Sequence, residues 1–576
     1  MSLDPKLFDY DEAADVWVAR GMGDFAYADG SEDYLAEVFE SVEHVSDYPV
    51  EFADQIRDWP SRYHLSHQRV NLMDSISELI DPSWSVLELG AGPGALTKWL
   101  AGRVAHVDVI EGSRARAAVN RRRTREDTNV RVMVGNIVDA PIPETYDMAT
   151  LIGVLEYGKT REGCLDMLRK VRSALTGDGV LILAIENRLG AKYWAGCRED
   201  HCSRFFEGLL EYPNADSPIT FSRRELQAIL SEAGFAHQQF YHAFPDYKLP
   251  TVMFRESDEI EPLRPYQWAR EFAEEYTGAR LFLFPDPLLL KSVSDAGLLW
   301  EFSNSFVVAC SVSERPALET SWLVRKYWNK HRPETHHTIS LYKREGQYRI
   351  ERAPLGPGLD ETQCGDYRFS LKNADYVNGV LLTFEVYSAL VSERWFERVS
   401  ALAREVQDEA KQRFWKGEVD DEGYPLLHGA SLDFAFWNLV RTPDGSLVLI
   451  DEKWECLAPI PADYLMFRNL LNTFGSFSAF VKPGPLAAIR QLLEESYPQI
   501  TDERIQAHFV RETDFQSQAT GRESEVKPPE EARYGANAVD RLSRLEAAAY
   551  AKDKAAEQLA AIAPSIETLT HLLGEE

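Results

Sequence analysis

Five short apolar runs alternate with helical stretches between residues 86 and 186. The runs are VLEL, VDVIE, VRVMVG, MATLIGVL and VLILAIE. Such alternation is typical of a doubly wound, mostly parallel α/β sheet. We therefore predict an α/β domain over residues 81–256, in which the looser segment 190–255 supplies a lid and the final strands.

The segments on either side of this domain carry different patterns. Residues 1–80 show helical and aromatic patterning without strand alternation, which predicts a helical cap. Residues 281–535 predict a second α/β domain, in which helices follow a set of strands. The strand-like runs of that domain lie at 304–310, 321–327, 337–343 and 347–353.

The C-terminal tail, residues 536–576, places apolar residues on a repeat of about 3.5 positions. They are Leu542, Leu545, Ala549, Ala556, Leu559 and Ala563, with interruptions at Lys552 and Pro564. We expect a C-terminal helix that either docks on the rest of the chain or forms a short coiled coil joining copies of it.

The net charge of −30 argues against a nucleic-acid partner, because phosphate binding needs a basic surface. The one basic run, Arg121–Arg125, is interpreted as a solvated helix end. No apolar run is long enough to cross a membrane, and the N-terminus does not resemble a signal peptide. We expect a cytoplasmic protein.

Six cysteines are scattered over the 576 residues and predict no disulfide framework. Cys197, His201 and Cys202 form their only cluster. A zinc site would need a fourth ligand and a better spacing, so an ordinary loop is the favoured interpretation.

The sequence SVLELGAGPGALT, which starts at Ser85, predicts a nucleotide-binding loop between a strand and a helix. Its glycines let the backbone approach a ligand and leave amides free at a helix N-terminus. The spacing differs from the dinucleotide pattern, and Glu88 lies two residues before the first glycine. Both features point away from a pyrophosphate.

The ends of the next two strands supply further candidate ligand contacts. Glu111 ends the second strand, where a carboxylate can accept hydrogen bonds from both ribose hydroxyls. Asn136 and Ile137 follow the third strand, where an amide can pair with an adenine edge.

These motifs resemble class I S-adenosylmethionine-dependent methyltransferases, which have a Rossmann-like fold. The resemblance implies that Glu88, Gly90, Gly92 and Gly94 surround the methionine part of the cofactor. It also implies that Glu111 holds the ribose, that Asn136 and Ile137 contact adenine, and that Val154 belongs to the same site. A sulfonium carries positive charge and no phosphate, so nearby carboxylates suit it.

The loop also looks like that of ribosomal RNA adenine dimethylases. Those enzymes carry an Asn-Pro-Pro-Tyr-like element after the fourth strand, whereas this chain has GVLEY, ending at Tyr157. The net negative charge of this chain also disfavours RNA as a substrate, because binding RNA phosphates needs a basic surface.

Four stretches resemble methyltransferases encoded with bacterial surface-polysaccharide (O-antigen) glycosyltransferases. They are DWPSRYHLSHQRVNLM, IGVLEY, LILAIENRLGAKYWAGCREDH and FPDYKLP. The resemblance implies a sugar hydroxyl on a lipid-linked or nascent glycan as the acceptor, with glycosyltransferases as partners at the inner face of the membrane. Tyr63, His64 and Arg69 are candidates for gripping the acceptor or closing the cofactor pocket.

Methyl transfer to a hydroxyl needs a base near the carboxyl ends of the fourth and fifth strands. The candidates are Glu156, Glu186, Asp200 and His201, of which we favour His201 because its ordinary pKa is about 6.5. A metal ion held by Glu186, Glu199 and Asp200 is the alternative, with Mg²⁺ as its natural ion. We do not predict a metal.

The stretch LHGASLDFAFWN, followed by SLVLID, has the spacing of a catalytic Asp, a metal-binding Asn and a strand-end Asp. Asp433, Asn438 and Asp451 resemble those residues in aminoglycoside- and choline-kinase-like phosphotransferases. No glycine-rich loop precedes a strand lysine, and Arg352 lies near the place of that lysine. We predict a kinase-like domain that is catalytically degenerate; an active kinase and an unrelated domain are the alternatives.

Overall fold

The computed structural model describes most of the chain. The residues described are 4–21, 29–214, 217–276, 278, 280–314, 318–482 and 484–528, with 542, 545–552 and 554–558 in the C-terminal tail. The helices of the first half are α1 (Glu32–Ser41), α2 (Trp59–Leu65), α3 (Asn71–Ser75), α4 (Ala95–Ala101), α5 (Arg114–Arg123), α6 (Arg161–Ala174), α7 (Ala191–Trp194), α8 (Arg223–Glu232), α9 (Asp286–Asp295) and α10 (Leu299–Phe302).

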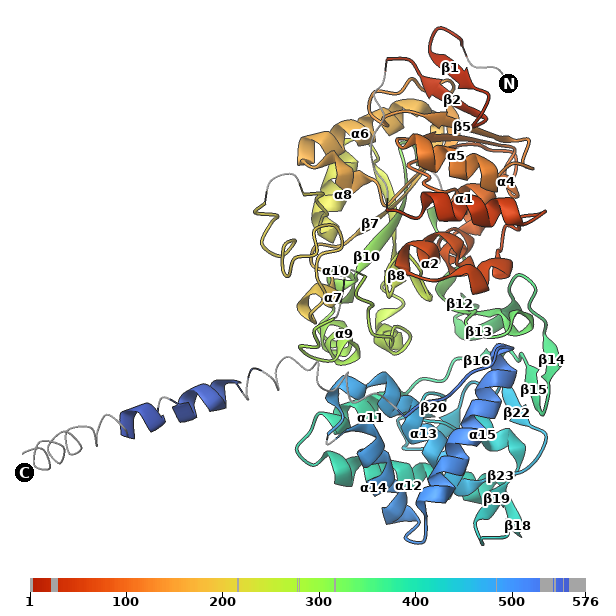
Figure 1. The fold of residues 1–576 in the computed structure, drawn as a ribbon, viewed down its shortest axis with the longest axis vertical. Helices are drawn as coiled ribbons and strands as arrows, with labels where there is room; N and C mark the ends of the chain where they lie inside the picture. Colours follow the sequence, from red (N-terminus) through yellow and green to blue (C-terminus); the bar gives the residue numbers. More distant parts are fainter. Residues whose placement is uncertain are drawn as a thin grey trace, which may run out of the picture.

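One large mixed sheet runs through the upper part of the molecule (Figure 1). Its strands, in spatial order, are β1 (Phe8–Asp11), β2 (Val16–Ala19), β5 (Val130–Val134), β4 (His106–Glu111), β3 (Ser85–Leu89), β6 (Tyr146–Ile152), β7 (Leu175–Glu186), β10 (Ser305–Ser311), β8 (His237–Phe244), β9 (Val252–Arg255), β11 (Trp322–Trp328), β12 (His337–Arg344), β13 (Gln347–Pro354) and β16 (Ala374–Asp375). The strands from β2 to β7 pair in parallel, which confirms the five predicted strands.

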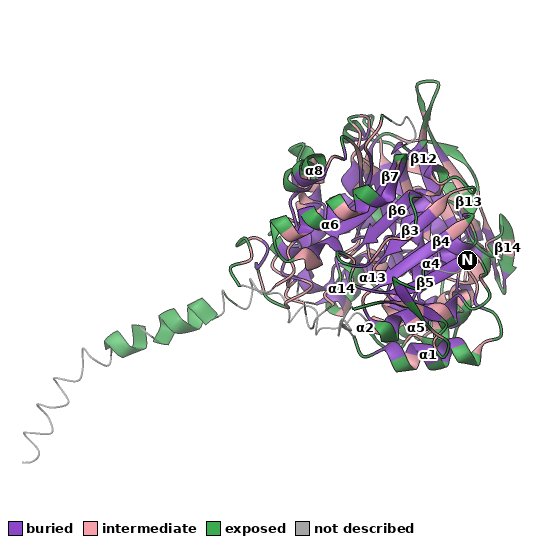
Figure 2. Ribbon diagram, turned by 90° about the horizontal axis from the view of Figure 1, so that it is seen from above, coloured by how far each residue is buried: buried purple, intermediate pink, exposed green. Residues whose placement is uncertain are grey.

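The parallel strands are buried on both faces. Along β7, Leu181, Leu183 and Ile185 pack in one core with α6 and α8, whereas Ile182 and Ala184 pack in the core that also contains α3 and α4. In Figure 2 the strands of this sheet are buried, while α6 and α8 keep exposed outer faces. The doubly wound architecture follows from this two-sided burial.

One strand in the middle of this sheet comes from a later part of the chain than predicted. β10 lies antiparallel between β7 and β8, with Val308 opposite both Leu183 and Phe240. The predicted domains, residues 81–256 and 281–535, therefore assign β10 to a different domain from the sheet that contains it. The apolar pattern located the strand correctly, but periodicity does not say which sheet a strand joins.

The N-terminal segment is not wholly helical, so the prediction for residues 1–80 is wrong in part. β1 and β2 form a hairpin, and β2 extends the edge of the sheet beside β5. Each strand has only four residues, too few to show a clear alternation. α1, α2 and α3 supply the expected helical cap.

The basic run at the end of α5 is not a solvated helix end, as the sequence suggested. Arg123 is buried and donates to the carbonyl of His64, while Arg121 pairs with Asp15. Arg125 donates to carbonyl oxygens at the end of α1. These arginines attach the N-terminal segment to the domain.

The second half combines the antiparallel strands β11–β13 with a mainly helical part. The helices of that part are α11 (Leu382–Leu390), α12 (Trp395–Phe414), α13 (Ala462–Ser476), α14 (Pro485–Ser496) and α15 (Asp502–Thr520). Three small sheets accompany them: β14 (Glu361–Cys364), β15 (Tyr367–Ser370) and β22 (Trp454–Cys456); β17 (Val380–Leu381), β20 (Leu439–Arg441) and β21 (Leu447–Leu449); and β18 (Trp415–Val419), β19 (Pro425–Leu427) and β23 (Ile460–Pro461).

The described residues of the C-terminal tail are helical and exposed, and they project from the body of the molecule (Figure 1). Leu542 and Leu545 are both more than half exposed, so these residues are not docked on the chain. Ala549 and Ala556 are exposed as well, Leu559 and Ala563 lie outside the described residues, and the coiled coil stays a prediction. None of the described helices has the length and apolar character needed to cross a membrane.

Candidate active site

The glycine loop between β3 and α4 has the backbone conformation that requires glycine. Gly90, Gly92 and Gly94 all have positive φ angles. A Cβ on Gly90 would lie 2.5 Å from Cγ2 of Val154, and one on Gly94 would lie 2.7 Å from Cγ of Asn120. The loop therefore has no room for a side chain at Gly90 or Gly94, whereas Gly92 is required by its positive φ alone.

Glu111, the last residue of β4, lies across from this loop. Its Oε2 accepts a hydrogen bond from the amide of Gly92 at 2.8 Å, and its Oε1 accepts one from Ser113 at 2.9 Å. These bonds fix the carboxylate at the carboxyl edge of the sheet. Each oxygen keeps a lone pair for a ligand hydroxyl.

Glu88 is buried at the end of β3, and its Oε2 accepts a hydrogen bond from Thr97 at 2.6 Å. Burial raises the pKa of Glu88 to about 7, and the nearby charge of Glu111 adds to the rise. The residue therefore changes charge in the neutral range, next to the predicted position of a cationic ligand.

A single cavity of about 460 Å³ joins this loop to three of the four predicted catalytic residues, and Glu186 is not among its lining residues. Its lining includes all but one of the predicted cofactor contacts, namely Glu88, Gly90, Gly92, Glu111, Asn136, Ile137 and Val154. The exception is Gly94, which lies at the start of α4 and shapes the loop. Glu156, Asp200 and His201 line the other part of the cavity.

The three predicted cap residues line the same cavity from α2 and the turn after it. Arg69 donates to the carbonyl oxygens of Tyr247 and Lys248 and lies over the ring of Tyr63. His64 is buried and pairs with Asp29 at 2.9 Å. Arg69 thus fastens the cap to the loop after β8, and the pair of His64 with Asp29 holds the N-terminal segment together.

His201 lies on the loop after α7, between two acidic side chains. Its Nδ1 is 2.9 Å from Oε1 of Glu199, and its Nε2 is 3.5 Å from Oε1 of Glu156. Burial alone would lower the pKa of His201, but its bonds to Glu156 and Glu199 and the charge of Glu186 raise it well above 6.5. His201 therefore favours the imidazolium form at neutral pH, and the unperturbed pKa for which it was favoured as a base does not apply here.

Glu186 and Asp200 are tied to two lysines, the buried Lys192 and the partly buried Lys248. Lys248 contacts both Glu186 and Asp200, and Lys192 lies 2.7 Å from Asp200. Burial would raise the pKa of Asp200, but the two lysines hold it well below its usual range. Burial raises the pKa of Glu186, against the pull of Lys248.

The four predicted catalytic residues thus lie together, but in different states. Asp200 is paired with cations and is a poor base. Glu156 and Glu186 each keep one buried carboxylate oxygen without a hydrogen-bond partner in the described part of the chain. Glu199 and Asp200, which the sequence offered as metal ligands, have protein partners instead.

Sequence reasoning missed Lys192, Lys248 and Asp246, which complete this charged cluster. Lys248 and Asp246 belong to FPDYKLP, one of the four stretches that resemble polysaccharide-associated methyltransferases, but neither was predicted as a site residue. Their spacing alone does not show that they meet Glu186, because β8 and β7 become neighbours only through β10.

The second half brings together the three residues of its kinase-like motif. Nδ2 of Asn438 donates to the carbonyl oxygens of Asp433 and Asp451, both at 3.1 Å. Oδ2 of Asp433 accepts from the backbone amides of Lys453 and Trp454. Burial raises the pKa of Asp433 to about 6.

Asp451 is paired with two cations. Lys453 Nζ lies 2.9 Å from its Oδ2, and Arg352 Nε lies 3.1 Å from its Oδ1. A lysine that sequence reasoning missed, Lys326, is buried on β11 near this group. Burial and the charges of Arg270 and Lys453 lower the pKa of Lys326 to about 7.

Residues 86–179 match the family model of a methyltransferase domain. Together with the glycine loop, Glu111 and the strand order, this match shows that the chain contains a class I S-adenosylmethionine-dependent methyltransferase domain. The match does not extend into the second half.

Individual known proteins resemble only parts of the chain. The (S)-coclaurine N-methyltransferase of Thalictrum flavum subsp. glaucum is 31% identical over 109 residues, which cover 17% of this chain and 28% of that protein. The N-methyltransferase NodS of Bradyrhizobium japonicum, solved with S-adenosyl-l-homocysteine, is 19% identical, with 27% of this chain and 74% of that chain covered and a TM-score of 0.21. CalS10, an amino pentose methyltransferase from Micromonospora echinaspora, is 22% identical over 25% of this chain and 57% of its own, with a TM-score of 0.20.

The state of Glu88 predicts a pH dependence of cofactor binding. The affinity for S-adenosylmethionine should rise as the pH rises through about 7, because Glu88 must lose its proton before it attracts the positively charged ligand. Calorimetric titrations below and above this pH measure the effect. In Glu88→Gln the rise should disappear; a rise of unchanged size in that variant would show that another group controls binding.

Proposed function

We propose that the chain transfers the methyl group of S-adenosylmethionine to a sugar hydroxyl of a bacterial surface polysaccharide, in the cytoplasm. The observation that carries the proposal is the cavity that joins the glycine loop and Glu111 to Glu156 and His201. The glycan as acceptor is supported by the resemblance of four stretches, which include the segment that carries His201.

The charged end of the cavity provides the chemistry for this transfer. A hydroxyl oxygen attacks the sulfonium methyl in line, so the new C–O bond forms as the C–S bond breaks and its electron pair goes to sulfur. Oε2 of Glu156 is buried and has no hydrogen-bond partner among the described residues, so it can accept the hydroxyl proton. His201 already carries a proton and stabilises the Glu156 carboxylate before transfer.

Glu156→Gln should lower kcat by about 10²- to 10⁴-fold, because it removes the proton acceptor. The affinity for S-adenosylmethionine should stay unchanged. The measurement uses labelled S-adenosylmethionine and the cognate lipid-linked glycan, with mass spectrometry to locate the methyl group.

Glu207→Gln is the matched control, since Glu207 is an equally buried glutamate that accepts hydrogen bonds from Asn214 outside the cavity. It should keep full activity. Label on RNA or protein would contradict the glycan acceptor, and label on a sugar amine would contradict the hydroxyl. Full activity of Glu156→Gln would rule out the assigned proton acceptor.

We also propose that the second half is a kinase-like module without phosphotransfer activity, which recruits a glycosyltransferase or binds the glycan. The pairing of Asp451 with Lys453 and Arg352 favours this role. Two cations already neutralise the carboxylate that would hold magnesium, so a metal–nucleotide complex would have to displace them.

Titration with ATP should therefore give no magnesium-dependent binding. The same preparation titrated with S-adenosylmethionine controls for folded protein. Magnesium-dependent ATP binding that Asp451→Ala abolishes would show instead that this half is an active phosphotransferase.

A further inference from the structure

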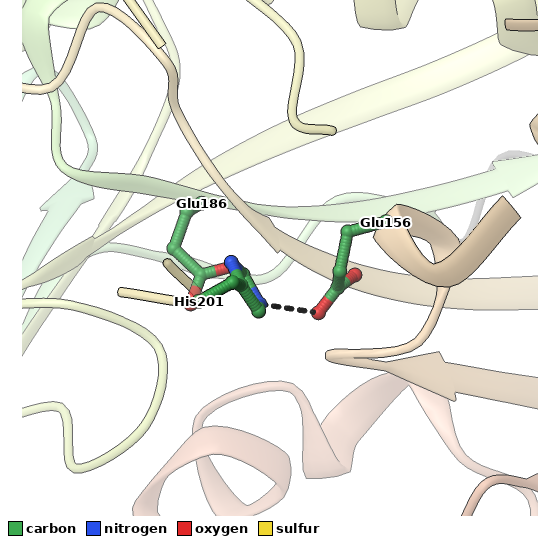
Figure 3. A group of neighbouring side chains, drawn as sticks. All are labelled: Glu156, Glu186 and His201. Atoms are coloured by element: carbon green, nitrogen blue, oxygen red, sulfur yellow. Dashed lines mark ion pairs between the residues drawn. The ribbon is translucent and has the colours of Figure 1, made fainter. Parts of the chain in front are cut away.

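We propose that Glu156, Glu186 and His201 bind one divalent metal ion at the acceptor end of the cavity. One ligand atom from each residue lies within 4.8 Å of the others. The residues come from three separate elements: Glu156 from the turn after β6, Glu186 from the end of β7, and His201 from the loop after α7. Figure 3 shows both carboxylates beside the His201 ring.

Two buried oxygen atoms in this cluster lack a partner. Oε2 of Glu156 and Oε2 of Glu186 accept no hydrogen bond from any described residue, although the two residues are only 1% and 0% exposed. A buried carboxylate oxygen without a partner is costly. A metal ion bound between the two carboxylates offsets this cost.

His201 is oriented as a metal ligand. Its Nδ1 faces Glu199, whose other oxygen is held by the backbone amides of His201 and Cys202. This leaves Nε2 turned toward Glu156. A carboxylate that holds one ring nitrogen of a histidine while the other binds the metal is the usual arrangement around protein-bound ions.

The cluster holds more negative than positive groups. Its carboxylates belong to Glu156, Glu186, Glu199, Asp200 and Asp246, and its lysines are Lys192 and Lys248. His201 gives up its proton when its Nε2 binds the ion. Lys248 contacts Oε1 of Glu186 and leaves Oε2 free. A divalent ion supplies the missing positive charge in a buried place where unpaired charge is unfavourable.

Two carboxylate oxygens and one imidazole nitrogen suit an ion such as Mn²⁺. Bonds of about 2.1 Å bring ligand atoms to within about 4.2 Å of one another, so the three side chains need to move inward only slightly. Water or the acceptor completes the coordination.

The role of the ion rests on the proposed function. An acceptor hydroxyl bound to the ion becomes more acidic, and its proton passes to the carboxylate oxygen of Glu156 that does not ligate the ion. The hydroxyl oxygen then takes the methyl group, and sulfur keeps the electron pair of the broken C–S bond.

The test is a titration of the full chain with Mn²⁺, followed by electron paramagnetic resonance, which detects the free ion. We expect one bound ion per chain. Glu186→Gln and Glu156→Gln should each abolish detectable binding, and Glu199→Gln should weaken it by about 10- to 100-fold by releasing the histidine. Glu207→Gln should bind as the unaltered chain does.

Two controls separate this inference from other results. Asp451→Asn should leave Mn²⁺ binding unchanged, since loss of binding there would place the ion in the second half. Calorimetry with S-adenosylmethionine in the presence of EDTA measures cofactor binding without metal. It shows whether each variant is folded and binds the cofactor that the proposed function requires. Absence of Mn²⁺ binding in a chain that binds S-adenosylmethionine, or full binding by Glu186→Gln, would overturn the metal site alone.

Discussion

The burial of several carboxylates at the carboxyl edge of β6 and β7 is the constraint on which the candidate site depends. Parallel pairing makes the two strands end together, so Glu156 and Glu186 are brought beside each other. A group of buried acids is stable only with compensating cations. Lys192 and Lys248 supply part of that compensation and hold Asp200 and Glu186 in place.

The same charges connect the cap to the segment between β9 and β10, residues 256–304. Tyr276 donates to Oδ2 of Asp246 at 2.7 Å, and its ring stacks on Trp59 with the centroids 3.9 Å apart. Arg62 of α2 also pairs with Glu274. This segment thus holds the cap over the cavity and is part of the site.

Sequence patterning located the strands and the cofactor loop because those features are local. Glycines with positive φ, an acid at a strand end and short apolar runs are all visible within a few residues, and nearly all the residues chosen from them line one cavity. β10 and the first hairpin were harder, since the partner of a strand is set by long-range packing. The glycan acceptor came from resemblance, and it stays a proposal.

The protonation states could not be predicted, because they depend on neighbours distant in sequence. His201 was favoured as a base for its ordinary pKa. Glu156, which follows a different strand, raises that pKa and stabilises the imidazolium form. Asp451 has the spacing of a metal ligand, but Arg352 on β13 pairs with it and neutralises its charge. Residue type and spacing identified the groups in both cases, and the surrounding charges decide what those groups can do.

The most direct test of this account is a crystal structure of the chain with S-adenosylhomocysteine. We expect the ribose hydroxyls to bind Glu111, the adenine to lie beside Asn136 and Ile137, and the sulfur to face Glu156 and His201. A ligand bound outside this cavity, or bound in the reverse direction with its adenine against Glu156, would contradict it.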